Sequence, residues 1–224
     1  MSSRFICARR GYGRMARFVN RATLVALITL LLAVAPATGA TRILAFGDSL
    51  TAGFGVAPNQ SFPAQLAARL KADGYDVVVD NAGVSGDTTA DGLARFNWAM
   101  GSHPDIVLLE FGANDMLRGL APAKAAANLD AMLNKLKAAR VKVLLLGMHA
   151  VANWGADYQK SFDAIYPMLA KKYDVPLYPF FLDGVALDPK LNQADRLHPN
   201  PAGVAVIVDR VAPLVEQLLG KSEG

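Results

Sequence analysis

The chain has 224 residues, of which 53% are hydrophobic and 19% are charged, and no repeat or low-complexity tract is present. This composition excludes a disordered chain and is typical of a single globular domain. Six of the 23 basic residues are arginines before residue 41, where no acidic residue lies, so the rest of the chain has 17 basic and 19 acidic residues. That part is slightly acidic, and the sequence predicts no nucleic-acid partner.

Residues 1–40 have the three-part plan of a secretory signal peptide. An arginine-rich start precedes the apolar run LVALITLLLAV at residues 24–34, and small residues then offer cleavage after Ala37 or Ala40. An uncleaved membrane anchor is the alternative, but the strongly apolar part is well short of the roughly 20 residues that a membrane span needs. We therefore expect cleavage, and an exported protein that is periplasmic or secreted.

The N-terminal segment holds two candidate start methionines and the single cysteine of the chain. Met1 and Met15 are both candidate starts, because the sequence from Met15 alone is a signal peptide of more usual length. Cys7 is the single cysteine, so the mature domain over residues 41–224 has no disulfide, thiol nucleophile or cysteine metal site. We expect this domain to be soluble and monomeric, without stable membrane insertion after cleavage.

Past residue 41, five short apolar runs are predicted to form strands. Each is rich in β-branched residues or leucine and lacks polar alternation, which is typical of parallel strands buried on both faces. In chain order they are RILAF, DVVVD, DIVLLEF, VKVLLLGM and VPLYPFF.

Segments with helical periodicity separate these strands. Residues 61–73 begin with a serine suited to an N-cap position, and residues 122–140 place four apolar side chains on one face. In the last helix, Asn200 is the expected cap and Pro201 the expected first residue. The side chains expected in the core are Leu129, Met132, Leu133 and Leu136 of the second helix and Val204, Ile207, Val208, Val211 and Val215 of the last.

This alternation predicts an α/β fold, a three-layer α/β/α sandwich with a five-stranded, mostly parallel sheet. In such sheets the ligand site lies beyond the carboxyl ends of the strands. Polar residues follow four of the predicted strands: Gly47, Asp48 and Ser49 after the first, Gly86 after the second, Asn114 and Asp115 after the third, and Asp195 and His198 after the fifth. Each group alone is ordinary turn or capping chemistry.

Together these residues supply every part of an acyl-transfer site. Ser49 is a candidate nucleophile, His198 a base that takes its proton, and Asp195 an acceptor that fixes the imidazole tautomer. The backbone N–H groups of Ser49 and Gly86 and the side-chain amide of Asn114 are candidate oxyanion donors. Residues 47–51 read GDSLT instead of the GxSxG of a nucleophile elbow, which argues against the α/β-hydrolase fold.

The same four blocks, in order and with similar spacing, resemble the GDSL esterase and lipase family, also called SGNH hydrolases. The likeness runs from Arg42 to about Leu219 and is greatest to the exported thioesterases, lysophospholipases and arylesterases of that family. It implies a flavodoxin-like fold and the catalytic roles just given for Ser49, Asp195 and His198. It also implies hydrolysis of small-molecule carboxylic esters or thioesters through an acyl-enzyme, with no cofactor.

A set of apolar and aromatic residues is predicted to form the acyl groove, although each is equally suited to the core. The set is Leu117, Met148, His149, Trp154 and Tyr158. Chain-length preference and the nature of the leaving group stay open, and carbohydrate O-deacetylation is an alternative because the same site residues serve it.

Two further functions remain as alternatives. Asp48 and Asp115, with Asn114 and His198, could bind metal in a phosphoesterase, but no histidine-rich motif accompanies them. We expect instead that Asp48 hydrogen-bonds within its own turn, that Asp115 caps the helix after it, and that no metal is bound. A non-catalytic lipid- or sugar-binding module on the same fold would ordinarily have lost one of the five site residues.

Overall fold

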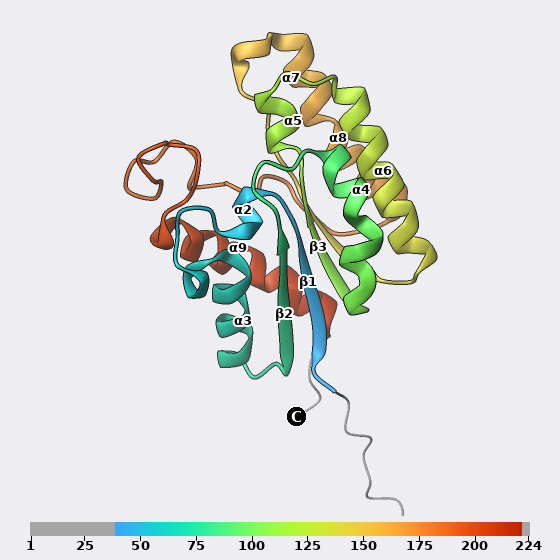
Figure 1. Ribbon diagram of the computed structural model, residues 1–224, viewed down its shortest axis with the longest axis vertical. Coiled ribbons are helices and arrows are strands. Elements are labelled where there is room, and N and C mark those ends of the chain that lie inside the picture. Colours follow the sequence, from blue (N-terminus) through green and yellow to red (C-terminus); the bar gives the residue numbers. More distant parts are fainter. Residues whose placement is uncertain (1–38, 221–224) are drawn as a thin grey trace, which may run out of the picture. The chain divides into compact units, whose positions relative to one another are not determined.

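The computed structural model describes residues 39–220, so the predicted signal peptide lies outside the described residues (Figure 1). Five strands form one sheet in the order β2-β1-β3-β4-β5, and every neighbouring pair is parallel. The strands are β1 (Thr41–Gly47), β2 (Val77–Gly83), β3 (Ile106–Glu110), β4 (Lys142–Leu146) and β5 (Leu177–Tyr178). The predicted parallel sheet is confirmed, and all five apolar runs contribute to it.

Helices cover both faces of the sheet (Figure 1). On one face α3 (Phe62–Ala72) packs against α9 (Pro201–Leu219), and on the other α6 (Pro122–Ala138) packs between α4 (Thr89–Ala99) and α8 (Ile165–Tyr173). Shorter helices, α2 (Ser49–Ala52), α5 (Ala113–Leu117) and α7 (Ala156–Asp163), follow strand ends or loops. Three 3₁₀ turns cover Pro58–Gln60, Met100–Ser102 and Ala152–Trp154. The three-layer α/β/α prediction is confirmed. No helix within residues 39–220 is long and apolar enough to cross a membrane.

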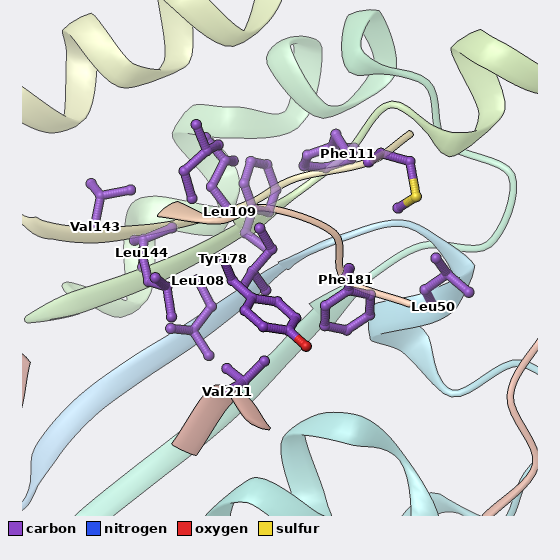
Figure 2. Close-up of a cluster of buried hydrophobic side chains, with 14 of the residues drawn as sticks. Leu50, Leu108, Leu109, Phe111, Val143, Leu144, Tyr178, Phe181 and Val211 are labelled. Carbon is purple, nitrogen blue, oxygen red and sulfur yellow. The ribbon is translucent and has the colours of Figure 1, made fainter. Parts of the chain in front are cut away.

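The core lies between the sheet and these helices, as the sequence predicts. All nine side chains predicted for the faces of α6 and α9 are buried. In Figure 2, Val211 of α9 lies beneath the ring of Tyr178, and Leu108 and Phe181 flank that ring. The side chain of Asn200 accepts hydrogen bonds from the backbone N–H groups of Ala202 and Gly203, which confirms the predicted cap of α9.

Two expectations about local structure were wrong. Strand β2 is not buried on both faces: it lies at the sheet edge, and Val78 is 37% exposed. Ser61 occupies the N-cap position of α3, but its hydroxyl donates to the carbonyl of Pro58 instead of capping the helix. The preceding 3₁₀ turn supplies an acceptor at 2.9 Å, and this local bond replaces the cap.

Parallel register brings the functional strand ends together. Gly47 at the end of β1 is level with Gly83 of β2, and Phe46 is level with Leu109 of β3. Because the strands run in one direction, the loops that follow β1, β2 and β3 leave from the same edge of the sheet.

Candidate active site

Ser49 is the first residue of α2 and follows the end of β1 after a single residue, Asp48. The Asp48 carboxylate accepts a hydrogen bond of 3.0 Å from the backbone N–H of Leu50, as predicted for its own turn. A side chain at Gly47 would collide with Thr51 and with the backbone of Glu110. Glycine is therefore required for β1 and β3 to approach this closely just before the serine.

A row of hydrogen bonds links three side chains at this strand edge. The Nε2 atom of His198 is 2.9 Å from the Oγ atom of Ser49, and its Nδ1 atom is 2.7 Å from the carboxylate of Asp195. A carboxylate only accepts, so Nδ1 must carry the proton, which leaves Nε2 of the neutral ring free to accept one from the serine. This is the geometry that a serine nucleophile and its base require.

Hydrogen bonds within the segment from Asp195 to His198 hold its carboxylate and imidazole together. One carboxylate oxygen of Asp195 accepts from the backbone N–H groups of Leu197 (2.9 Å) and His198 (3.0 Å), while the other contacts the imidazole. The imidazole hydrogen bond, followed by these backbone bonds, lowers the pKa of Asp195 from 3.8 to about 2. Because the pKa is lowered on folding, this stabilisation is present above the ordinary carboxyl range and is lost as the pH falls toward 2.

The three predicted oxyanion donors line the same cavity as His198. Gly86 has a φ of +89°, a left-handed conformation that glycine adopts without strain. The amide nitrogen of Asn114, in α5, donates to the carbonyl of Asp87 at 3.0 Å and to the carboxylate of Asp48 at 3.2 Å. The amide is thus held between the loop after β2 and the turn that carries Ser49.

The cavity beside Ser49 has a volume of about 430 Å³, which is in the range of small-molecule sites. Its apolar wall includes Leu50, Met116, Phe180, Leu182 and Leu187. Arg196 is the one lysine, arginine or acidic residue among those that line it. The ring of Phe54 packs on the ring of His198 with centroids 4.6 Å apart, so one side of the base is covered by an apolar group.

The predicted acyl-groove residues divide into two groups. Leu117, Met148 and His149 line the cavity, whereas Trp154 and Tyr158 do not, which corrects the prediction for these two. The indole N–H of Trp154 donates to the carbonyl of Met116 at 2.8 Å, and the hydroxyl of Tyr158 donates to the carbonyl of Leu120 at 3.0 Å. Their polar atoms thus hold α5 and the residues that follow it, and neither side chain contributes to the cavity lining.

The prediction for Asp115 was also wrong. Its carboxylate accepts from the backbone N–H (2.8 Å) and hydroxyl (2.6 Å) of Thr89, at the start of α4, and so does not cap the helix that follows it. Asp115 lies within α5 and is buried there, which directs the side chain toward α4. Among residues 39–220 no group of three histidine, cysteine, aspartate or glutamate side chains is placed to hold a metal ion.

Glu110, at the end of β3, is an ionisable residue that the sequence reasoning missed. It is fully buried, and one carboxyl oxygen accepts from the hydroxyl of Thr51 (2.8 Å) and from the backbone N–H of Asp48 (3.2 Å). Burial, and next the charge of Asp48, raise the pKa of Glu110 well above 4.5. Burial likewise raises the pKa of Asp48. The signal for this site was the single acid in the otherwise apolar stretch IVLLEF at residues 106–111.

Replacing Glu110 with glutamine is expected to make stability less dependent on pH. A carboxyl whose pKa is raised on folding binds more protons in the native state, so the free energy of unfolding falls as pH rises above the ordinary glutamate range. The largest slope from one group is about 1.4 kcal/mol per pH unit. Urea unfolding between about pH 5 and pH 8 measures this slope. Glutamine keeps an oxygen for Thr51, and Glu216→Gln in α9 is the control; a slope equal to that of the wild type would contradict the prediction.

The chain is similar to known proteins over most of its length. The model of the GDSL-like lipase/acylhydrolase family matches residues 45–206. Esterase TesA of Pseudomonas aeruginosa is 38% identical over 200 residues, which are 89% of this chain and 100% of that protein. Thioesterase 1/protease 1/lysophospholipase L1 of Escherichia coli K12 is 40% identical over 184 residues, which are 82% of this chain and 87% of that protein.

A solved structure agrees with these relatives. AlinE4, described as an SGNH-hydrolase family esterase, has a TM-score of 0.68 and 46% identity, covering 81% of this chain and 98% of its own. The family match includes every residue from Ser49 to His198. The chain therefore belongs to the GDSL-like lipase/acylhydrolase family, with the SGNH-hydrolase fold.

Proposed function

We propose that this protein is a serine hydrolase that cleaves carboxylic esters and thioesters through an acyl-enzyme. The observation that carries the proposal is the hydrogen-bonded row of Ser49, His198 and Asp195 beside an apolar cavity. The named activities of the relatives, esterase and thioesterase/lysophospholipase, support the same reaction class.

The reaction begins with attack of the Ser49 oxygen on the substrate carbonyl carbon, while His198 takes the serine proton at Nε2. The negative charge that develops on the carbonyl oxygen is stabilised by the backbone N–H groups of Ser49 and Gly86 and by the amide of Asn114. His198 then gives its proton to the leaving oxygen or sulfur, and the carbonyl–leaving-group bond breaks. Water repeats the sequence on the acyl-serine and releases the acid.

The apolar lining of the cavity favours the acyl group as the part of the substrate that binds inside it. Its lining is mostly aliphatic, so an acyl chain in it buries apolar surface without leaving polar groups unpaired. Asp195 keeps its negative charge at any pH well above 2, because its hydrogen bonds to His198 lower its pKa to about 2. That charge holds the imidazole tautomer and stabilises the imidazolium that forms after proton transfer.

We also propose that the protein is exported, that the signal peptide within residues 1–40 is cleaved after Ala37 or Ala40, and that the mature domain acts as a monomer. The arginine-rich start, the apolar run and the small residues support export. N-terminal sequencing of the protein recovered outside the cytoplasm tests it. A chain that begins at Met1 or Met15 would contradict cleavage.

The reaction class is tested with p-nitrophenyl esters from acetate to palmitate and with acyl thioesters. The purified wild-type protein is expected to hydrolyse these substrates, with turnover unchanged by a chelator, because the proposed steps use only side chains and backbone groups. The chain-length profile then measures how much of an acyl chain the cavity accepts. Turnover abolished by chelation would favour a metal-dependent reaction, and no turnover on any ester would favour a narrow deacetylase or a binding module.

A further inference from the structure

Arg95 lies on α4 beneath the proposed active site and makes three hydrogen bonds through three different nitrogen atoms. Its Nη2 atom donates to the carbonyl of Gly47 at 2.8 Å, and its Nη1 atom donates to the carbonyl of Ala82 at 2.8 Å. Its Nε atom donates to the carboxylate of Asp87 at 2.5 Å. Only 18% of the Arg95 side chain is exposed, so these bonds are shielded from water and salt.

Two of these bonds, those to Gly47 and Asp87, fix segments that carry proposed oxyanion donors. Gly47 stands two residues before Ser49, and Asp87 directly follows Gly86. The backbone carbonyl of Asp87 in turn accepts the hydrogen bond from the amide of Asn114. One guanidinium therefore holds the first two donor segments directly and the third through a single residue.

Two aromatic rings complete the surroundings of Arg95. The guanidinium carbon lies 4.6 Å from the ring centroid of Phe46, at the end of β1, and 5.6 Å from that of Phe111, directly after β3. The two rings meet edge to face with centroids 5.0 Å apart. These contacts fix the plane of the guanidinium, which a lysine ammonium would not reproduce because it lacks the planar fork.

We propose that Arg95 is a positioning residue that sets the geometry of the oxyanion hole formed by Ser49, Gly86 and Asn114. This inference rests on the proposed function, since an oxyanion hole matters only if the site performs acyl transfer. Arg95 does not touch the reacting atoms, and its effect passes through Gly47 and Asp87. Loss of the guanidinium lets the three donors drift relative to one another, and displacements of about 1 Å reduce turnover by up to 10²-fold.

The test compares Arg95→Met and Arg95→Lys with the wild type on a soluble p-nitrophenyl ester. Both variants are expected to lower kcat about 10- to 100-fold with KM little changed, because the substrate oxygen is uncharged when the ester binds and gains its negative charge only during the reaction. Arg69→Met is the matched control: Arg69 is also an arginine paired with acidic side chains, here Asp73 and Asp209, but it lies on α3 away from the site. Its kcat is expected to equal that of the wild type.

A double-mutant cycle with Asn114→Ala separates positioning from mere stabilisation of the fold. If Arg95 acts through the oxyanion hole, Asn114→Ala lowers kcat at least tenfold less in the Arg95→Met protein than in the wild type. Equal losses in both backgrounds would overturn the proposal, as would an Arg95→Met protein with normal kcat and only a lower Tm. Rates are counted per active site titrated with an organophosphonate, so unfolded protein does not contribute.

A milder variant keeps the test informative if Arg95→Met does not fold. Asp87→Asn removes the charge of the carboxylate that pairs with Nε but retains an acceptor oxygen and the backbone carbonyl that anchors Asn114. It is expected to lower kcat with KM unchanged, and unchanged kcat would overturn the role of this ion pair. The proposed function fails separately, since in that case the wild-type protein itself shows no turnover that depends on Ser49.

Discussion

Replacing Ser49 with alanine is expected to lower kcat by roughly 10⁴- to 10⁶-fold, because the acyl-enzyme route loses its nucleophile. The hydroxyl accounts for one hydrogen bond, to Nε2 of His198 at 2.9 Å, so removing it should leave the fold and the cavity intact. The measurement is single-turnover and steady-state hydrolysis of a p-nitrophenyl ester by the purified variant. Binding of a non-hydrolysable ester analogue is expected to be retained.

Ser161→Ala is the matched control for this prediction. Ser161 lies on α7, and its hydroxyl donates to the backbone carbonyl of Asp157 and not to a histidine. Its kcat is expected to match the wild type. Ester hydrolysis that persists in Ser49→Ala at more than about a hundredth of the wild-type rate would rule out the acyl-serine mechanism and would direct attention to water activated by another base.

The fold and the position of the site follow from sequence pattern because both depend on repeated, local signals. Apolar runs without alternation indicated parallel strands, and parallel strands carry their loops to one edge of the sheet. The polar residues after the first, second, third and fifth runs were therefore expected near one another. The structure places Ser49, Gly86, Asn114 and His198 around one cavity, as that argument requires. Their catalytic roles stay predictions.

The residues that support the site from behind could not be predicted from sequence pattern in the same way. Arg95 belongs to a helix whose pattern is that of any amphipathic segment, and its three acceptors lie 8 to 48 residues away along the chain. Two of these acceptors are backbone carbonyls, which leave no trace in the sequence. Trp154 and Tyr158 were misplaced for the opposite reason, because aromatic side chains near a groove suit both the cavity wall and the layer behind it.

The position of Glu110 in a buried strand was visible in the sequence, but its hydrogen-bond partners were not. An acid within a buried strand must be neutral or paired, since burying an isolated carboxylate costs several kcal/mol. The structure pairs it with Thr51 and the backbone of Asp48, directly beneath the turn that carries Ser49. Burial, and next the charge of Asp48, raise the pKa of Glu110 and so favour its neutral form beneath the nucleophile turn.

Replacing Asn114 with alanine is expected to lower kcat by about 10²- to 10³-fold with KM little changed, because one donor to the oxyanion is lost. Of its two hydrogen bonds, the one to the carbonyl of Asp87 is 3.0 Å and the one to the carboxylate of Asp48 is 3.2 Å. A substrate oxygen must displace one of these two acceptors, and we expect the longer bond, to Asp48, to give way. Asn97→Ala on the exposed side of α4 is the control, with activity expected to be unchanged.

Stability must be measured in parallel, because Asn114→Ala also removes a partner from the buried carboxylate of Asp48. Losing one hydrogen bond to a buried group costs about 1–3 kcal/mol, which urea unfolding detects. The two effects separate cleanly: destabilisation lowers the folded fraction and the titrated active sites together, whereas loss of an oxyanion donor lowers the rate per titrated site. A normal rate per site in Asn114→Ala would assign Asn114 to the support of Asp48 and leave the oxyanion to the backbone N–H groups of Ser49 and Gly86.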